Sequence, residues 1–334
     1  MSLRTAFRER RPFPGQDPWV VEHDGSLLLV QAAGRNSTIV VKRFHDLARM
    51  DRNVQTVIWP PGGRNGRLRQ LWAPELHHID GRWYVYYSAG DGRPGSHRSY
   101  ALVADDPLGP YGSLGPVHDP ANDVWAIDLT VFRHDGRLYA LWSGWDGPAD
   151  GFPQNLYVAP MDNPWTIGGQ RRCVSSPRYP WEMTVAPVNE GPQAFRHPAT
   201  DRLFVLYAAD ASWTQAYKTG LLEWTGGDVI DPAAWRKHER PLFTGGGHGC
   251  VVDTAGGSHL VYHRKVSGDP GWADREILSA PLDWDAAGRP VVLVGARGGA
   301  AASPSTAGLV HLEGSPPSPV PDVAPPARSG SPPR

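Results

Sequence analysis

Cysteine and methionine are both scarce, with two and four copies in 334 residues. Cys173 and Cys250 are too few for a disulfide framework in so long a chain, and no Cys-x-x-Cys spacing indicates a zinc site. Charge of one sign is also lacking, because the formal net charge is -1. Nucleic acid and anionic membranes both favour a basic face, so neither is expected as a partner.

Long apolar runs are absent as well. No stretch is long enough to span a bilayer, and the N-terminal MSLRTAFRERRPFPGQ has positive charges with no apolar segment behind them. The sequence thus predicts no signal peptide in this chain, and a cytoplasmic protein or a secreted one whose leader has been removed. Helical windows are few and brief, as at residues 44–51.

Aromatic residues and turn formers are abundant instead. The chain has 14 Trp, 11 Tyr, 38 Gly and 34 Pro, which separate short apolar or alternating runs. Aromatics at this level fill a β-rich core or line a surface that stacks on flat ligands such as sugar rings. Both interpretations predict an all-β protein.

One hairpin pattern recurs along the chain. HDGRLYALWSGW, from His134, has a short polar turn between two apolar runs, and IDGRWYVYYSAG, from Ile79, repeats it. Similar segments begin at His23, Ala199 and Thr254. By their residue numbers, the second turn residues of successive copies lie 56, 55, 65 and 56 residues apart, at Gly25, Gly81, Gly136, Asp201 and Gly257.

This period is close to that of a four-stranded propeller blade, about 40 to 50 residues. We therefore expect a five-bladed β-propeller over residues 1–300. A strand from the first fifteen residues would close the ring by pairing with the last blade, near residues 276–294. A β-sandwich of similar strand count is the alternative fold. Residues 301–334 are rich in Pro, Ser, Ala and Gly and are expected to form a disordered tail.

An ionisable residue precedes each repeated turn by six to eleven positions. The innermost strands of a propeller converge on its axis, so these residues would meet at one mouth of a central channel. Clustered carboxylates are costly, and separated carboxylates beside aromatic side chains are what glycoside hydrolysis needs. Any one acid can instead be a turn or cap residue, as in Asp17-Pro18. The five ionisable residues that precede the turns are Asp17, Glu75, Asp128, Glu190 and His248.

At these positions the chain resembles glycoside hydrolase family 43, the five-bladed propeller arabinofuranosidases and xylosidases. The resemblance covers residues 15–294 and depends on motifs that occur in order. The two stretches QNLYVAPMDNPWTI and SSPRYPWE are more similar to the α-L-arabinofuranosidase branch than to the β-xylosidases. The other motifs are QDPWVVEHDG, LWAPELHHIDGRWYVYYSA, AIDLTVFRHDGRLYALWSG, VNEGPQAF and REILSAPLDWDAAGRPV.

The resemblance implies a role for three acids. Asp17 would be the general base that activates water, Glu190 the general acid, and Asp128 the third carboxylate that tunes and orients the acid. An inverting reaction implies that base and acid stand roughly 6.5 to 9.5 Å apart. The expected function is an exo-acting α-L-arabinofuranosidase on arabinan or arabinoxylan. A β-xylosidase and a non-catalytic sugar-binding propeller are the alternatives.

Three further side chains, Trp72, Arg275 and His248, are candidates for substrate contact. Trp72 is expected to wall the sugar pocket, or else to be a core aromatic. Arg275 resembles an arginine that reaches sugar hydroxyls, and its alternative is a surface ion pair with Asp274 or Glu276. Glu75 is expected to hold its motif by hydrogen bonds, and Leu129, where the family more often has a small residue, to change the pocket beside Asp128.

His248 lies where the family has a histidine near the channel, often beside a calcium or sodium ion that is bound mostly by water. Here the motif is GGGHGCVV, with Gly249 and Cys250 in place of Asn and Ser, so the structural ion is left open. A lone histidine is a poor metal site by itself. No cofactor is required for the expected reaction. The expected partner is an oligo- or polysaccharide, and the protein is expected to be a monomer.

Overall fold

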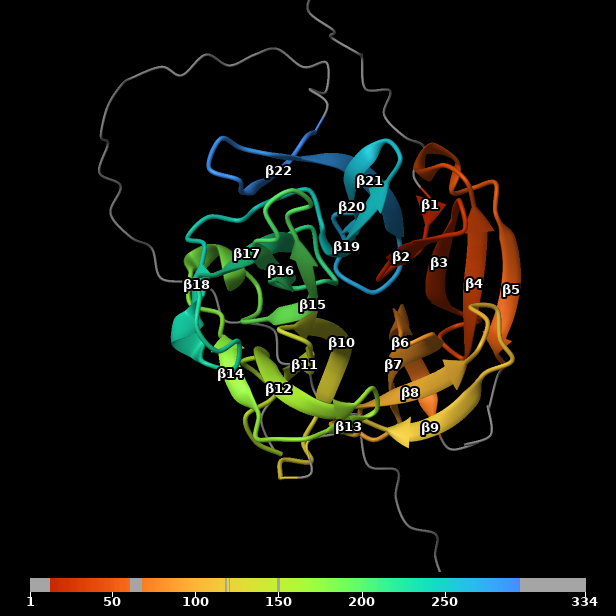
Figure 1. Ribbon diagram of the computed structural model, residues 1–334, viewed down its shortest axis with the longest axis horizontal. Helices are drawn as coiled ribbons and strands as arrows, with labels where there is room; N and C mark the ends of the chain where they lie inside the picture. Colours follow the sequence, from red (N-terminus) through yellow and green to blue (C-terminus); the bar gives the residue numbers. More distant parts are fainter. Residues whose placement is uncertain (1–12, 61–67, 118, 120, 149–150, 295–334) are drawn as a thin grey trace, which may run out of the picture. The chain divides into compact units, whose positions relative to one another are not determined.

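The computed structural model describes residues 13–60, 68–117, 119, 121–148 and 151–294. The predicted tail, residues 301–334, lies outside the described residues. The described chain forms five antiparallel sheets that follow one another in chain order around a common axis (Figure 1). The predicted five-bladed β-propeller is thereby confirmed, and the alternative sandwich is wrong.

The first three blades carry the N-terminal half of the chain. Blade 1 has β2 (Trp19–His23), β3 (Ser26–Ala33), β4 (Thr38–Phe44) and β5 (Val54–Trp59). Blade 2 has β6 (Arg69–Ile79), β7 (Arg82–Gly90), β8 (Arg98–Ala104) and β9 (Gly112–Pro116). Blade 3 has β10 (Ala126–His134), β11 (Arg137–Gly144), β12 (Asn155–Asn163), β13 (Thr166–Ile167) and β14 (Arg172–Ser175).

The last two blades complete the ring. Blade 4 has β15 (Asn189–Arg196), β16 (Leu203–Ala209), β17 (Lys218–Trp224) and β18 (Trp235–Lys237). Blade 5 has β19 (Gly247–Thr254), β20 (Gly257–Lys265), β21 (Arg275–Trp284) and β22 (Pro290–Val292), joined by β1 (Phe13–Pro14). The helices of the described residues are three short 3-10 turns, η1 (Leu47–Arg49), η2 (Pro180–Glu182) and η3 (Pro232–Ala234). Among the described residues, no helix has the length and apolar character needed to cross a membrane.

The repeated turns of blades 1, 2, 3 and 5 are tight two-residue hairpins, whereas six residues, 197–202, separate Arg196 from Leu203 in blade 4. In β10/β11 the pairing runs to His134 and Arg137, which leaves Asp135 and Gly136 as the two loop residues. Both have positive φ, 46° and 77°, which the favoured type I′ hairpin turn requires and which Asp and Gly tolerate. This explains why the Asp-Gly pair recurs between the first and second strands of blades 1 to 3.

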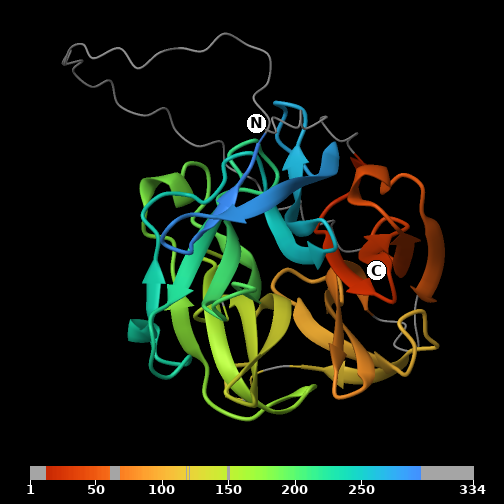
Figure 2. The ribbon, with the colours of Figure 1, turned by 45° about the horizontal axis from the view of Figure 1, so that its top comes forward.

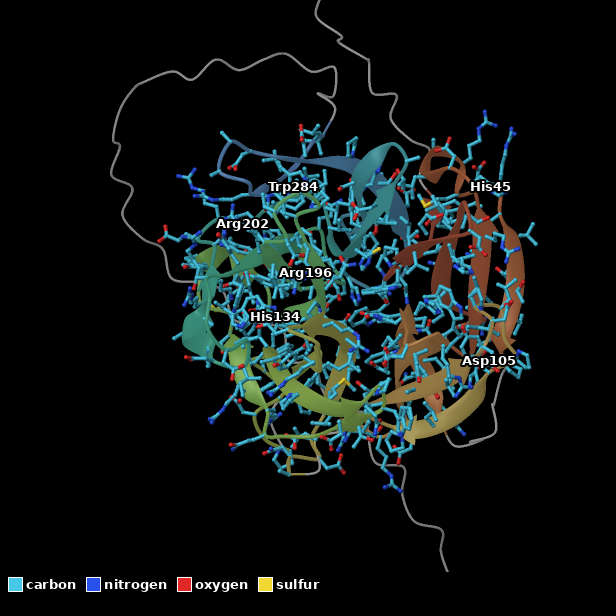
Figure 3. All side chains as sticks on the ribbon, viewed as in Figure 1. His45, Asp105, His134, Arg196, Arg202 and Trp284 are labelled. Carbon is cyan, nitrogen blue, oxygen red and sulfur yellow. The ribbon has the colours of Figure 1, made fainter. Side chains whose placement is uncertain are left out.

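The hydrophobic core lies between the blades. Each sheet buries both faces against its neighbours, so the inner strands are apolar for long stretches, as in VYY of β7 and VLYAA of β16. One cluster joins blade 1 to blades 2 and 5, and three others join blades 2 and 3, 3 and 4, and 4 and 5. Polar contacts between blades add to this packing. Arg196 Nη2 of blade 4, for example, lies 3.0 Å from His134 Nδ1 of blade 3, and both residues are labelled in Figure 3.

Ring closure follows the prediction. Phe13 and Pro14 of β1 pair with Ile277 and Glu276 of β21. β22 pairs with the other end of the same strand, at Leu282 to Trp284. The first and last sheets consequently lie side by side, as both Figure 1 and the tilted view of Figure 2 show.

Candidate active site

A β-bulge interrupts the first strand of blades 2 to 5, close to its beginning. The register with the second strand shifts there by an extra residue, which bends the strand and redirects a side chain. The shifts fall between Trp72 and Glu75, Ile127 and Thr130, Glu190 and Gln193, and Gly247 and Cys250.

Each bulge contains one residue with left-handed backbone geometry, and blade 1 has its counterpart just before β2. This conformation is uncommon for residues other than glycine and clusters at functional sites. The five equivalent residues and their φ angles are Asp17 (46°), Ala73 (42°), Asp128 (55°), Gly191 (53°) and His248 (43°). The bulges therefore bring Asp17, Asp128 and His248 together at one end of the propeller axis.

Asp17 lies among basic groups. Its Oδ1 atom is 3.4 Å from His248 Nδ1, 3.3 Å from His263 Nδ1 and 3.9 Å from Arg275 Nη1. Burial would raise the pKa of Asp17, but the neighbouring basic groups, His248, Arg275 and His263 in order of effect, outweigh burial and lower it. At neutral pH the guanidinium of Arg275 supplies the positive charge beside Asp17, because burial keeps His263 neutral. Asp17 is therefore a carboxylate at neutral pH.

The backbone of Asp17 is fixed by His263. The N–H of Asp17 donates to His263 Nδ1 at 3.1 Å, so this nitrogen carries no proton. Burial lowers the pKa of His263 to about 3, which keeps the ring neutral and able to accept that bond.

Glu190 has the opposite electrostatic environment. Its side chain is buried, its Oε1 accepts a hydrogen bond from the hydroxyl of Tyr217 at 2.8 Å, and Ser212 provides another. Burial raises the pKa of Glu190 to about 7, with the charge of Asp17 adding to the shift and the two hydroxyls opposing it. Glu190 thus retains a proton to a much higher pH than Asp17.

Asp128 interacts electrostatically with both Asp17 and Glu190. Its Oδ2 atom accepts the backbone N–H of Gly191 at 3.0 Å and lies 3.9 Å from His248 Nδ1. Burial, together with the charges of Glu190 and Asp17, raises the pKa of Asp128. Gly191 is required at this place, because a Cβ there would come within 2.7 Å of the His248 ring. The three predicted acids and His248 therefore form one cluster.

Glu75 is buried and lies within electrostatic reach of Asp128. It lies two residues beyond Ala73, the bulge residue of its blade, and its Oε2 contacts His77 Nε2 at 2.9 Å while Thr130 bonds its carboxyl group. Burial raises the pKa of Glu75, and Asp128 adds to the shift. As expected, Glu75 is held by hydrogen bonds. The position equivalent to Asp128 is held by Ala73 in blade 2 and by Gly191 in blade 4, so neither Glu75 nor Glu190 is the bulge residue of its strand.

Arg275 is not a surface residue. Its guanidinium lies beside Asp17, bonds the side chain of Gln16 and packs over the ring of Trp272 at 5.6 Å. The predicted alternative, an ion pair with Asp274 or Glu276, is wrong, because Lys265 and Arg264 face those two acids.

A pair of tryptophans adjoins both catalytic candidates, and the sequence interpretation missed it. Trp213 follows Ser212, which bonds Glu190, and Trp272 packs on Arg275, which faces Asp17. The two rings are 5.2 Å apart, and Trp272 is 63% exposed. An exposed aromatic beside a carbohydrate site can stack on a sugar ring.

Trp72 is half-buried and stacks on His97 with ring centroids 3.6 Å apart. Trp72 precedes the bulge residue Ala73 in β6, and its role as a wall of the sugar pocket stays a prediction. Leu129, in contrast, packs in the core between blades 2 and 3 with residues such as Tyr86 and Trp142. The prediction that Leu129 changes the pocket beside Asp128 is therefore wrong, because the side chain of Leu129 packs in the core between the two blades.

The remaining residues of the site come from connections at the same end of the blades. Strands β15 and β16 form a hairpin, so the end of β16 returns to the start of β15. The connection that follows carries Ser212, Trp213 and Tyr217 to Glu190. These residues lie in the segment DASWTQAY between β16 and β17, which the repeated turn pattern does not mark.

The predicted ion has little support among the side chains. No group of three or more His, Cys, Asp or Glu residues in the described ranges could hold a metal. His248 Nδ1 faces two carboxylates, and Cys250 Sγ accepts the N–H of Val20 at 3.2 Å. The described side chains thus do not supply a donor set, and an ion bound mostly by water stays a prediction.

Known proteins resemble this chain over most of its length. The family model described as Glycosyl hydrolases family 43 matches residues 12–290. The alpha-L-arabinofuranosidase 43 of Humicola insolens is 32% identical over 272 residues, which are 76% of this chain and 56% of that protein. The extracellular exo-alpha-(1->5)-L-arabinofuranosidase of Streptomyces chartreusis is 32% identical over 274 residues, 76% of this chain and 82% of that protein.

Solved structures agree in fold. The crystal structure of an alpha-L-arabinofuranosidase from Lactobacillus brevis has a TM-score of 0.75 and 29% sequence identity, and the match covers 83% of this chain and 93% of that one. The chain spans little more than half the length of the Humicola insolens relative.

Proposed function

Since the chain belongs to glycosyl hydrolase family 43 and is a glycoside hydrolase, we propose that it is an inverting, exo-acting α-L-arabinofuranosidase. The relatives named above are arabinofuranosidases, and two of them are about one third identical over three quarters of this chain. Substrates would be arabinan or arabinoxylan and the oligosaccharides derived from them.

The observation that carries this proposal is the separation of two pKa values within one cluster. Asp17 is held ionised by the basic groups around it, whereas burial raises the pKa of Glu190 to about 7. Two carboxyl groups with opposite protonation states at the same pH are what an inverting hydrolase needs, one as base and one as acid.

In the proposed reaction, Asp17 accepts a proton from a water molecule while the water oxygen forms a bond to the anomeric carbon. The bond from that carbon to the leaving oxygen breaks, and Glu190 transfers its proton to this oxygen. Attack comes from the face opposite the leaving group, so the configuration inverts. Asp128 holds the backbone beside Glu190 by accepting the N–H of Gly191. Arg275 orients Asp17 and contacts sugar hydroxyls.

Hydrolysis of 4-nitrophenyl α-L-arabinofuranoside, compared with the β-D-xylopyranoside, tests the proposal. The wild type is expected to prefer the arabinofuranoside, and Asp17→Ala is expected to lose activity by orders of magnitude. The matched control is Asp105→Ala, because Asp105 is an exposed acid that pairs with Arg82 on the outer part of blade 2. Preference for the xyloside would instead support a β-xylosidase. Sugar binding measured by calorimetry without any product would support a binding propeller.

Exo action, cellular location and oligomeric state each follow as separate proposals. Release of arabinose alone from linear arabinan would support exo action, and oligosaccharide products would contradict it. The Streptomyces chartreusis relative is named extracellular, which supports the secreted alternative over the cytoplasmic one. A monomer is proposed, and sedimentation would measure its mass.

A further inference from the structure

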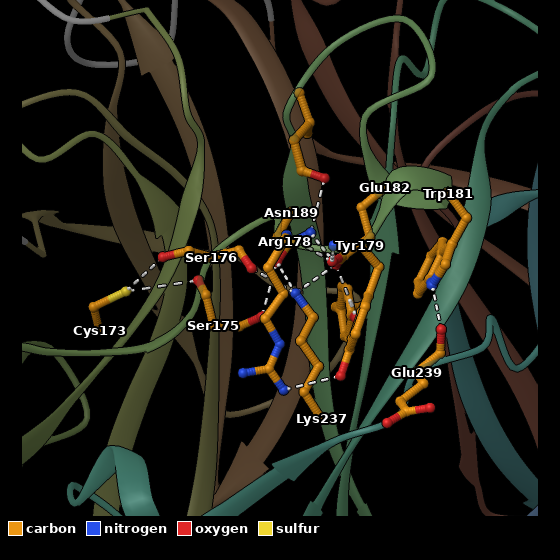
Figure 4. Close-up of polar contacts among 12 residues, drawn as sticks. Cys173, Ser175, Ser176, Arg178, Tyr179, Trp181, Glu182, Asn189, Lys237 and Glu239 are labelled. Carbon is orange, nitrogen blue, oxygen red and sulfur yellow. Dashed lines mark hydrogen bonds and ion pairs between the residues drawn. The ribbon is translucent and has the colours of Figure 1, made fainter.

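A buried ion pair lies behind the strand that carries Glu190. Lys237, at the end of β18, contacts Glu182, at the end of η2, and both side chains are almost fully shielded from solvent (Figure 4). The Oε2 atom of Glu182 also accepts the backbone N–H groups of Arg178 and Tyr179, each at 2.9 Å. The hydroxyl of Tyr207 donates to Oε1 of Glu182 at 3.1 Å.

Asn189 connects this pair to the active site, because it directly precedes Glu190 in β15. Its amide nitrogen donates to Glu182 Oε1 at 2.9 Å, and its amide oxygen accepts from Lys237 Nζ at 2.9 Å (Figure 4). Its backbone carbonyl accepts from the hydroxyl of Ser143 in blade 3 at 2.9 Å. Every polar group of the Asn189 side chain is thereby fixed by a buried partner.

The other neighbour of Glu190 is fixed as well. Gly191 donates its N–H to Asp128 at 3.0 Å. Glu190 therefore stands between two residues that are both tied to buried groups, and its main chain cannot shift without breaking a buried hydrogen bond. Breaking such a bond leaves an unsatisfied polar group, which is costly in a dry interior.

We propose that Glu182, Asn189 and Lys237 form a clamp that positions Glu190, so that its proton points at the leaving oxygen of the substrate. The three are positioning residues, since none of them is required to touch the sugar. This proposal depends on the proposed function, in which Glu190 is the general acid.

Stability gives little reason for such a pair. Removing two charges from water is expensive, and apolar side chains of similar volume are often as stable as a buried ion pair or more so. The cost is visible here, because burial lowers the pKa of Lys237 to about 8 although Glu182 opposes the shift. A directional, fully bonded network does provide what an apolar core cannot, a single geometry for the adjoining strand.

The test uses two substrates that differ in their need for an acid. A 4-nitrophenolate leaves without much help from a proton, whereas the methoxide of methyl α-L-arabinofuranoside must be protonated as it leaves. Misplacing the acid by a fraction of an ångström should lower kcat on the methyl glycoside by about 10- to 100-fold and on the nitrophenyl glycoside by less than about 3-fold. KM should change little on either substrate.

Lys237→Met and Glu182→Gln are the two variants, and Glu223→Gln is their matched control. Glu223 is a buried acid in the same blade that pairs with Arg202 and Arg236, far along β17 from Glu190. The control is expected to lose stability without changing the ratio of the two kcat values. Should the single variants unfold, the double variant Lys237→Met with Glu182→Gln removes both charges together and gives the same readout.

The outcomes separate the two proposals. A selective loss on the methyl glycoside supports the clamp. An equal loss on both substrates, or no loss on either, overturns the clamp and leaves the enzyme assignment intact. A wild type that is folded and cleaves neither arabinofuranoside overturns the proposed function itself.

Discussion

The carboxylate of Asp128 accepts a hydrogen bond from the backbone N–H of Gly191, and this 3.0 Å contact joins blade 3 to the residue that follows Glu190. It places a buried acid against the strand that carries the proposed proton donor. Burial raises the pKa values of both Asp128 and Glu190, and the charge of Glu190 adds to the shift at Asp128. Such a coupling is reciprocal, so a charge on Asp128 also disfavours ionisation of Glu190.

Asp128→Asn tests this coupling. Asparagine keeps an oxygen that can accept the Gly191 N–H and tolerates the positive φ of this position, so the fold should be retained. Loss of the charge should lower the pKa of Glu190 and reduce kcat/KM at pH 7 by about 100-fold. The alkaline limb of the pH profile should move to lower pH, and an unmoved limb would contradict the coupling.

Tyr217→Phe should move the alkaline limb of the pH profile to higher pH. The Tyr217 hydroxyl donates to Glu190 and favours its ionised form, which holds the pKa down against burial. In the wild type, activity should fall as the pH rises through about 7, where Glu190 loses its proton, and persist down to the low pKa of Asp17. Removing the hydroxyl raises the pKa of Glu190, so the variant should remain active to higher pH. A shift to lower pH would show that Glu190 is not the group observed.

Glu190→Gln should stabilise the fold at alkaline pH. The folded pKa of about 7 exceeds the unfolded value of 4.5, so the folded state binds more protons between these values. The favourable contribution of Glu190 is complete below about pH 4.5 and is lost as the pH rises through 7. The variant should therefore gain roughly 1 to 3 kcal/mol of unfolding free energy over the wild type at pH 8, and much less at pH 5. Urea unfolding at the two pH values measures this, and an equal difference at both would refute the raised pKa.

Trp272→Ala tests the aromatic pair beside Arg275. If the exposed Trp272 ring stacks on the sugar beyond the cleaved bond, kcat/KM on arabinotriose should fall by about 5- to 10-fold. Methyl α-L-arabinofuranoside has no second sugar ring, so its hydrolysis should change little. Trp165→Ala, which removes another exposed tryptophan on blade 3, is the control. Equal losses on both substrates would place Trp272 in the support of Arg275 instead.

The sequence predicted the fold from one local feature. A polar turn followed by an apolar strand recurs five times, with Asp-Gly at positive φ in the first three copies, and this recurrence predicted the blades and their number. The need to close such a ring predicted the closing strand. The same periodicity brought Asp17, Asp128, Glu190 and His248 to one end of the propeller. The blades and the position of these four residues depend on strand order and turn chemistry, which are local in sequence.

Other parts of the site could not be reached in this way. The apolar pattern does not reveal the β-bulges, so it did not predict that Ala73 and Gly191, and not Glu75 and Glu190, hold the positions equivalent to Asp128. His263 bonds the backbone of Asp17 from the second strand of blade 5, across 246 residues of sequence. Such a contact follows from the packing of complete blades and not from any motif.

The stereochemistry of hydrolysis tests the central claim most directly. Proton NMR of 4-nitrophenyl α-L-arabinofuranoside, recorded from the first turnovers and before the free sugar equilibrates, identifies the anomer that forms first. A base at Asp17 that activates water opposite an acid at Glu190 predicts β-L-arabinofuranose as the initial product. Initial formation of the α anomer would mean that an enzyme carboxylate attacks the sugar itself, and would contradict the roles given to both residues.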